Sequence, residues 1–386
     1  MDSQSDTPRL LYVVNEDFAF LSHRLPMARA ARDAGFNVHV ATRVGAKADA
    51  IRAEGFELHS IPFHRGSRSP FAALAVMLAI RKIENNIQPA IIHHVGLQSC
   101  VLGGLAALGA RAPQVNALTG LGYAFTGEAS RARFLRSLMS VLLRFLLNRR
   151  HTVVLVQNPD DQSALERIGV RNNQIALISG SGVDTDMLRS MPEPDGAITV
   201  GFAGRLLTDK GIRALVAAHR LLRSGGLDVE LLIAGEPDPA NPASVSFDEA
   251  KAWTNEPGIS WLGRIDDIAT LWQCSHIAAL PSHREGLPKS LLEAAACGRP
   301  MVATDVPGCR EITIHERTGF LVPVEDPPAL AQAIRRLAES QELRHSFGKA
   351  ARDMVVARMS AVAIGQQTVD LYRKLLSRQK QGIEVY

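Results

Sequence analysis

Two cations in the second half of the chain lie where a phosphorylated ligand could bind. Arg205 and Lys210 lie in GFAGRLLTDKG (201–211), after an apolar run that predicts a strand and before a helical pattern that begins near Lys210. Gly204 at the strand end permits close backbone approach, and the helix adds the positive end of its dipole. Two cations beside free N–H groups favour a diphosphate site. A solvated turn with two surface charges is the alternative.

Two carboxylates occupy a second stretch of the same construction, HREGLPKSLLEAAACGRPMVATDVPG (283–308). Glu285 lies in a loop after a predicted strand, Pro288 suits the first turn of a helix, and Glu293 lies within that helix. The eight positions between the glutamates span about 12 Å on a helix, whereas paired glycosidase carboxylates lie roughly 5–9.5 Å apart. Separate contacts with one long ligand are therefore favoured over an acid–base pair. For Glu293, an ion pair with Lys289 at the i, i+4 spacing is the alternative.

The elements that must position these residues alternate between strands and helices. In the first half, continuous apolar runs predict strands separated by helix-length segments: LLYVVN, NVHVAT, ELHSIPF, AIIHHV, PQVNAL and TVVLVQN. After a Gly-, Ser-, Asp- and Pro-rich linker at 179–197, the alternation resumes with ITVGFAG, ELLIAG, ISWLGR, HIAALPS and PMVATD. This order predicts an α/β protein with doubly wound parallel sheets. Ligands of such sheets bind at the carboxyl ends of strands, where both charged stretches lie.

The domain organisation follows from this pattern. We expect two Rossmann-like domains facing across a cleft, one over 1–185 and one over 186–365, with a last helix over 366–386. The length of 386 residues also exceeds one ordinary core.

Composition and targeting signals narrow the class of protein. With 46% apolar residues, 21% charged residues and a net charge of +4, the chain does not have the character of a dedicated nucleic-acid binder. The N-terminal stretch lacks the pattern of a signal peptide, and no apolar run reaches the roughly 18–20 residues needed to cross a bilayer. We therefore expect a cytoplasmic protein. The four cysteines form no C-x-x-C pair and are expected to be buried and reduced: Cys100, Cys274, Cys297 and Cys309.

Several motifs point away from other enzyme classes. The D-x-D string at 184–186 lies in the linker, so we expect a turn or helix cap there and not a metal site. No H-x-x-x-H, Walker A loop or G-x-G-x-x-G is present, which disfavours metallohydrolases, P-loop NTPases and NAD enzymes.

The motifs of the second half, taken together, resemble one enzyme family. The segments GRLLTDKG and EGLPKSLLEAAACGRPMVATDVPG, with ERTGFLVPVED (316–326) and the linker SGSGVDTD, are similar to the retaining glycosyltransferases of family 4. The resemblance covers most of the second domain. It implies the GT-B fold, with an acceptor-binding domain over 1–185, a donor-binding domain over 186–365 and a last helix over 366–386 that returns to the first domain. It also implies a nucleotide diphosphate sugar as the donor, which we expect to be a UDP-sugar. It implies no cofactor beyond this substrate and no required metal.

The resemblance also assigns roles to residues. Arg205 and Lys210 resemble the pair that neutralises the donor diphosphate, Glu293 the glutamate that holds the ribose hydroxyls, and Glu285 the glutamate at the reacting end of the donor sugar. The loop at 263–265 takes the place where the nucleobase is held. The expected donor-binding residues are Gly204, Arg205, Lys210, Ile265, Glu285, Gly286, Leu287 and Glu293. Of these, Arg205, Lys210 and Glu285 are the expected catalytic residues.

The first domain resembles a subset of the family. NEDFAFLSHRLPMARAARDAGFNVHVAT (15–42) and NALTGLGYAFTG (116–127) are similar to members that build capsular, O-antigen and lipid-linked glycans. Two departures are clear: the loop after the first strand lacks a Gly-Gly pair, and Thr119 stands where many members have a histidine. The expected acceptor or donor contacts are His23, Arg24, His93, His94, Thr119 and Gly120. A purely structural role is the alternative for the first four.

The stretch 130–151 contains six arginines and no acidic residue. At helical spacing, six apolar side chains gather on one face: Leu135, Leu138, Met139, Leu142, Phe145 and Leu146. Arg133, Arg136 and Arg144 lie opposite. This pattern suits the surface of an anionic bilayer. The alternative is that the apolar face packs on the domain's own sheet.

These observations predict a retaining hexosyl- or N-acetylhexosaminyl-transferase. It would move a sugar from a nucleotide diphosphate sugar to a glycan acceptor carried on a polyprenyl diphosphate, in bacterial surface polysaccharide or glycoconjugate biosynthesis. Contact of 130–151 with the inner face of the plasma membrane is left open, and no nucleic-acid partner is expected. The alternatives are a nucleotide-sugar epimerase, a phosphorylase-like enzyme of the same fold, and a non-catalytic scaffold of a glycan assembly complex.

Overall fold

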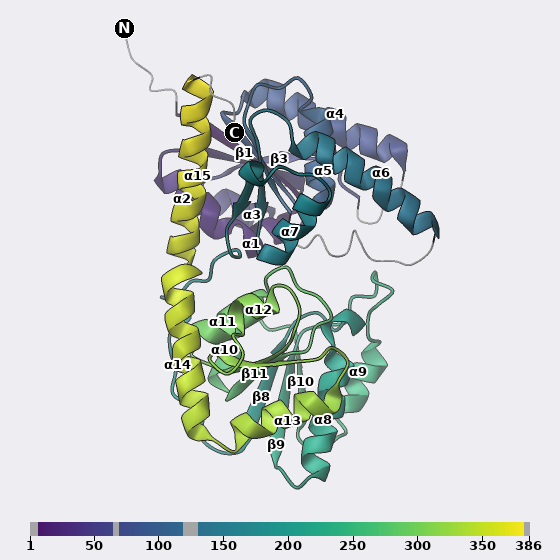
Figure 1. Ribbon diagram of the computed structural model, residues 1–386, viewed down its shortest axis with the longest axis vertical. Helices are drawn as coiled ribbons and strands as arrows, with labels where there is room; N and C mark the ends of the chain where they lie inside the picture. The colour runs from purple at the N-terminus through teal and green to yellow at the C-terminus, as the bar shows by residue number, and fades with distance from the viewer. Residues whose placement is uncertain (1–6, 65–68, 119–129, 382–386) are drawn as a thin grey trace. The chain divides into compact units, whose positions relative to one another are not determined.

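The chain divides into two compact units. The computed structural model describes residues 7–64, 69–118 and 130–381, with the side chains of all of these except 130–136 and 380. Unit 1 comprises Met1–Gly182 and Ala361–Tyr386, and unit 2 comprises Val183–Ser360 (Figure 1). These boundaries lie a few residues before those predicted at 185 and 365.

Unit 1 is built on a seven-stranded sheet in the order β3-β2-β1-β4-β5-β6-β7, in which all pairs are parallel. The strands are β1 (Arg9–Glu16), β2 (Asn37–Arg43), β3 (Glu57–Ser60), β4 (Ile91–Val95), β5 (Gln114–Ala117), β6 (Thr152–Val156) and β7 (Ile175–Leu177). The central strands β4, β5 and β6 are buried along their whole length, as continuous apolar runs predict for a sheet covered on both faces.

The helices of unit 1 include the last helix of the chain. They are α1 (Asp17–His23), α2 (Leu25–Asp33), α3 (Ala48–Ala53), α4 (Pro70–Ile87), α5 (Leu97–Ala106), α6 (Ser130–Leu147), α7 (Pro159–Arg167) and α15 (Ala361–Gln381). Helix α15, yellow in Figure 1, packs along α2. A Cβ on Gly365 would come within 2.6 Å of the Ala30 Cβ, so the glycine permits this close approach. The expected return of the terminal helix to the first domain is therefore observed.

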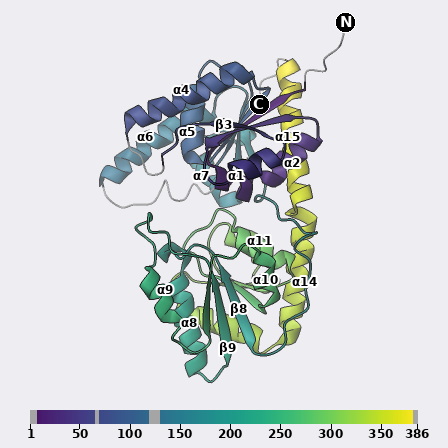
Figure 2. The same ribbon diagram turned by 180° about the vertical axis from the view of Figure 1, so that it is seen from behind.

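Unit 2 has a six-stranded parallel sheet in the order β10-β9-β8-β11-β12-β13. Its strands are β8 (Ile198–Ala203), β9 (Val229–Ala234), β10 (Ile259–Gly263), β11 (Ile277–Leu280), β12 (Met301–Thr304) and β13 (Gly319–Val322). Its helices are α8 (Ile212–Ser224), α9 (Phe247–Trp253), α10 (Ile268–Gln273), α11 (Lys289–Ala296), α12 (Cys309–Ile312), α13 (Pro327–Ala338) and α14 (Gln341–Arg358). Helices α8 and α9 lie on one side of the sheet, and α10 and α11 on the other (Figures 1 and 2).

The two doubly wound sheets confirm the predicted fold class. Two strands had not been predicted: β7 and β13, which are short and lie at sheet edges. In the part of the chain that the structure describes, no helix combines the length and apolarity that crossing a bilayer needs.

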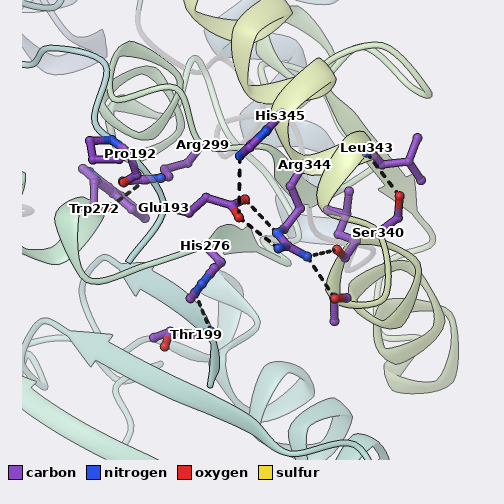
Figure 3. Close-up of polar contacts among 12 residues, drawn as sticks. Pro192, Glu193, Thr199, Trp272, His276, Arg299, Ser340, Leu343, Arg344 and His345 are labelled. Atoms are coloured by element: carbon purple, nitrogen blue, oxygen red, sulfur yellow. Dashed lines mark hydrogen bonds and ion pairs between the residues drawn. The ribbon is translucent and has the colours of Figure 1, made fainter. Parts of the chain in front are cut away.

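The linker is fastened to unit 2 by buried arginines. Arg344 on α14 donates two hydrogen bonds to the carboxylate of Glu193, at 2.7 and 2.9 Å (Figure 3). Arg299 donates to the carbonyl oxygens of Trp272 and Pro192, both at 2.8 Å. Burial alone would raise the pKa of Glu193, but its hydrogen bonds and attraction to Arg344 lower it overall.

Candidate active site

The loops that follow β8 and β11 flank the point where the strand order of unit 2 reverses. The chain runs outward from β8 through β9 to β10, then returns to place β11 on the other side of β8. In open parallel sheets, ligands bind at the carboxyl ends of the strands at such a switch point. The stretches at 204–210 and 281–288 are the two loops at this position.

Lys210 and Glu285 are brought together across these loops. Lys210 Nζ and Glu285 Oε1 are 2.5 Å apart, and Ser282 Oγ donates to the same Oε1 at 2.7 Å. The Glu285 side chain is 10% exposed and that of Lys210 is 23% exposed. Because one oxygen accepts both bonds, Glu285 is held in a fixed orientation. Ser282 had been recognised only as the end of a strand.

The backbone of the two loops enforces this pairing. The His283 N–H donates to the Asp209 carbonyl oxygen at 2.8 Å. Gly211 has a φ of +70°, and a Cβ there would collide with the Pro281 carbonyl oxygen. A glycine is therefore required between the 3₁₀ turn at Thr208–Lys210 and helix α8. The helix expected near Lys210 begins only at Ile212, because the left-handed residue separates it from that turn.

Arg205 follows the end of β8, in the same loop as Lys210. Its Nη1 donates to Asp238 Oδ2 at 3.0 Å, and its side chain is 55% exposed. The Gly204 N–H donates to the Ala234 carbonyl oxygen at 3.0 Å, while a Cβ on Gly235 would collide with the Gly204 carbonyl oxygen. The sequence did not single out Asp238, although it closely follows the predicted strand ELLIAG.

Helix α11 presents its N-terminus beside Glu285. Pro288 is the N-cap residue and makes no side-chain capping bond, so the first-turn amides from Lys289 onward have no acceptor within the helix. The preceding Gly286 is held close to Gly308, whose φ is +77° and at which a Cβ would collide with the Gly286 carbonyl oxygen. Leu287 packs against the core of unit 2. This construction suits an anion at the helix N-terminus.

Glu293 lies on α11 and forms the contact that its spacing allows. Its Oε1 is 3.4 Å from Lys289 Nζ, and its side chain is 12% exposed. Burial raises the pKa of Glu293, against the opposing effect of the Lys289 ammonium group. The ion pair that the i, i+4 spacing offered as the alternative is therefore present. The predicted contact of Glu293 with a ligand stays a prediction.

The loop after β10 completes this edge of unit 2. Gly263 has a φ of +63°, and its carbonyl oxygen accepts from the Gly235 N–H at 2.7 Å. Ile265 is partly buried against the core. The ends of β8, β9 and β10 are therefore joined by backbone bonds through Gly204, Gly235 and Gly263.

The candidates in unit 1 lie mainly in its interior. His93 and His94 on β4 are fully buried. The Nδ1 of His93 lies 2.6 Å from Tyr372 Oη, and the Nδ1 of His94 lies 3.0 Å from Asn116 Oδ1. Burial lowers the pKa of His94 to about 4 and that of His93 well below its ordinary value. Neutral, buried histidines favour the structural alternative.

The remaining unit 1 candidates are divided between interior and surface. Arg24 is fully buried, and its Nη1 lies 3.2 Å from Met27 Sδ. His23 is the exposed last residue of α1. Thr119 and Gly120 lie outside the described residues, so their predicted contacts stay predictions.

The apolar face predicted for 130–151 is partly wrong, as the burial of helix α6 shows. Leu143, Leu146 and Leu147 are buried in unit 1, whereas Leu138 and Phe145, which were predicted to share the apolar face, are exposed. Leu135, Arg133 and Arg136 fall outside the described side chains. The helix therefore packs one apolar stripe on its own domain and leaves a second apolar stripe exposed.

Two smaller expectations have clear outcomes. Asp184 Oδ1 accepts from the N–H groups of Asp186 and Met187 at 3.0 and 2.9 Å, which confirms the turn predicted for the D-x-D string. Cys274 is exposed, and the expectation that all four cysteines are buried is wrong for it. It follows the short helix α10 as its C-cap, where the chain lies at the surface.

Comparisons with known proteins agree with this geometry. The family model for "Glycosyl transferases group 1" matches residues 197–340, and that for "Glycosyl transferase 4-like" matches residues 9–158. N,N'-diacetylbacillosaminyl-diphospho-undecaprenol alpha-1,3-N-acetylgalactosaminyltransferase of Campylobacter jejuni is 26% identical over 380 residues, covering 92% of this chain and 98% of the relative. The glycosyltransferase named EpsD of Bacillus subtilis is 27% identical over 382 residues, covering 95% and 96%.

Solved structures show the same fold. Sucrose-phosphate synthase from Thermosynechococcus elongatus aligns with a TM-score of 0.79 at 21% identity, covering 96% of this chain and 99% of that one. HepE of Anabaena in complex with UDP aligns with a TM-score of 0.78 at 19% identity, covering 95% and 100%. The two sheets and the loops at the switch point of unit 2 define a glycosyltransferase of the GT-B type. The chain belongs to glycosyltransferase family 4, as its motifs predict.

Proposed function

We propose that the protein is a retaining glycosyltransferase that moves a sugar from a UDP-sugar to a lipid-linked glycan in bacterial surface polysaccharide or glycoconjugate biosynthesis. The observation that carries the proposal is the pairing of Lys210 with Glu285 at the switch point of unit 2, beside the open amides of α11. Cations, free N–H groups and an oriented carboxylate meet there, as a sugar diphosphate requires.

The chemistry follows from these groups. The bond between the sugar C1 and the diphosphate oxygen breaks, and the acceptor oxygen forms its bond to C1 on the same face. Arg205, Lys210 and the α11 amides stabilise the negative charge that develops on the leaving diphosphate. The proton of the acceptor hydroxyl passes to an oxygen of the leaving group. Glu285, fixed by Ser282, orients the reacting end of the sugar.

The donor assignment rests on two further points. The Anabaena protein has been solved with UDP and with UDP-glucose, and we extend a UDP-sugar donor to this chain. Glu293 would hold the ribose hydroxyls, and the loop at 263–265 would hold the base through its backbone. Because side chains and amides neutralise the diphosphate, the proposal needs no metal for transfer, and turnover should persist in EDTA.

The donor site is tested by thermal unfolding with UDP, GDP, ADP, CMP and NAD. Specific binding to the folded protein at 100 times the dissociation constant stabilises it by about 2.7 kcal/mol. We expect a shift with UDP that is lost in Glu293→Ala and kept in Glu339→Ala. Glu339 is a matched control because it also forms an i, i+4 pair, with Arg335 at 3.3 Å. A shift with GDP alone would contradict the UDP assignment, and binding without turnover of any UDP-sugar would favour a scaffold.

The lipid-linked acceptor is proposed from the name of the Campylobacter jejuni relative and from exposed apolar side chains on unit 1. Leu138, Val141 and Phe145 are exposed on α6 at i, i+3 and i+7, with the exposed Arg144 beside them. This arrangement suits a protein that acts at the inner face of the plasma membrane. Replacing all three apolar residues by serine should abolish co-sedimentation with phosphatidylglycerol vesicles. The double change Leu221→Ser and Val356→Ser on unit 2 is the control, and unchanged binding of the α6 variant would contradict the proposal.

A further inference from the structure

Three potential metal ligands converge at the edge of the unit 1 sheet. His39 lies on β2, and Glu57 and His59 lie on the edge strand β3. His39 pairs in register with Glu57, and Ala41 pairs with His59. Because side chains alternate along a strand and match across a parallel pair, all three side chains lie on one face of the sheet.

The two distances from the His39 ligand atom are close to those in a coordination sphere. His39 Nδ1 is 3.1 Å from His59 Nε2 and 3.3 Å from Glu57 Oε2. One ligand atom from each residue lies within 4.8 Å of both others. Zn–N and Zn–O bonds of about 2.0–2.2 Å place neighbouring ligands of a tetrahedral ion roughly 3.3 Å apart.

We propose that His39, Glu57 and His59 bind a divalent transition-metal ion, with Zn²⁺ as the preferred species, that clasps β3 to β2. Two imidazoles and one carboxylate are a common ligand set for zinc and leave a fourth position for water. Asn37 Nδ2 donates to Glu57 Oε1 at 3.1 Å, which orients the other oxygen, Oε2, towards His39. Such an outer partner is typical of a metal ligand.

Hydrogen bonding alone satisfies this cluster poorly. The His39 Nδ1 carries at most one proton, yet it faces both a carboxylate oxygen and an imidazole nitrogen. Each imidazole offers one ring nitrogen of this cluster as a ligand atom that a cation can use. Together with the strand register, this favours a metal over an isolated pair of histidines.

The test uses the full chain without a polyhistidine tag. Zinc binding is measured by titration calorimetry on the chelator-treated protein, and Co²⁺ is added separately to record the visible absorption of a tetrahedral site. We expect one bound ion per chain, and at least ~10-fold weaker binding in Glu57→Gln and in His59→Gln. Glu57 is largely exposed, so its replacement tests the site without disturbing the core.

The control is His64→Gln, which removes an exposed histidine of the same unit whose Nδ1 lies 2.9 Å from the Pro62 carbonyl oxygen. This variant should bind Zn²⁺ as the wild type does, and Zn²⁺ should raise the melting temperature of both. The proposal is overturned if the wild type binds no stoichiometric Zn²⁺, or if Glu57→Gln and His59→Gln bind it with unchanged affinity. It does not depend on the proposed transferase activity, because neither the ligands nor the measurement involves the donor loops.

Discussion

The two units treat their buried polar groups differently. In unit 2, the buried charge of Arg344 is matched by Glu193, and Arg299 donates to two carbonyl oxygens. In unit 1, Glu84 and His93 each have a buried side-chain atom without a hydrogen-bond partner among the described residues. Burial raises the pKa of Glu84 to about 7 and lowers that of His93. The difference between these two sets of residues teaches that a buried ion can be kept by a matched partner, whereas a buried group without one shifts its pKa towards the neutral form.

The largest effect should come from breaking the charge pair of unit 2. Arg344→Met leaves the carboxylate of Glu193 buried without its partner and should lower the free energy of unfolding by about 3–5 kcal/mol. Urea unfolding of the purified variant measures this. The double variant Arg344→Met with Glu193→Leu should recover most of the loss, because no lone charge remains. If the free energy of unfolding of Arg344→Met lies within about 1 kcal/mol of the wild-type value, the charge pair does not stabilise unit 2 as the comparison states.

The pH dependence of stability should reveal the neutral carboxyl group of unit 1. The folded-state pKa of Glu84 is raised from 4.5 to about 7. Its contribution to the free energy of unfolding is therefore fully present below pH 4.5 and is lost as the pH rises through 7. The loss is on the order of 3 kcal/mol. Glu84→Gln should flatten the decline between pH 5 and pH 8 in urea unfolding. The lowered pKa of Glu193 affects the free energy of unfolding only at acidic pH, below this range. If the stability of Glu84→Gln declines as steeply as that of the wild type between pH 5 and pH 8, Glu84 is not the cause of the decline.

A second ion pair of unit 2 should matter for turnover more than for stability. In the proposed mechanism, Lys210→Ala removes a cation that stabilises the leaving diphosphate, so it should lower turnover by on the order of 10²-fold or more. Turnover is measured with a panel of UDP-sugars, alongside a melting curve. Arg220→Ala, which removes an exposed ion pair with Glu256 on the same unit, should change neither. Near-normal turnover of Lys210→Ala would refute its role.

The smallest effect should come from the buried hydroxyl of Tyr372 in unit 1. This hydroxyl lies 2.8 Å from Tyr12 Oη and 2.6 Å from His93 Nδ1. Tyr372→Phe leaves both partners buried with one bond fewer and should cost about 1–3 kcal/mol of unfolding free energy. If His93 is structural, KM and turnover should stay unchanged. If Tyr372→Phe keeps normal stability but loses activity, His93 has a role in binding or catalysis after all.

Much of the fold could be predicted because its signals are local. The runs ITVGFAG and HIAALPS became β8 and β11, since continuous apolar segments between helix-length stretches have few other solutions in a parallel sheet. The strands β7 and β13 escaped prediction, and each carries only a short apolar pattern of three or four residues. The equally short edge strand β3 was predicted within the longer run ELHSIPF.

The positions of the candidate residues were predicted more fully than their partners. Arg205, Lys210, Glu285 and Glu293 all lie on unit 2 at the strand ends or on α11, as expected. The contacts of Glu285 with Ser282 and of Glu293 with Lys289 are local in sequence, and the second was the alternative that the spacing offered. The contacts of Arg205 with Asp238 and of Lys210 with Glu285 join segments 33 and 75 residues apart, so they depend on which loops neighbour one another.

The sequence by itself determined the class of fold, the family and the positions of the charged residues. These depend on the types and spacing of residues along one strand, turn or helix. Only the tertiary structure decided that His93 and His94 are interior, that α6 exposes part of its apolar surface, and that His39 meets Glu57 and His59. Burial and encounters between distant segments depend on strand order and helix packing, which no local pattern encodes.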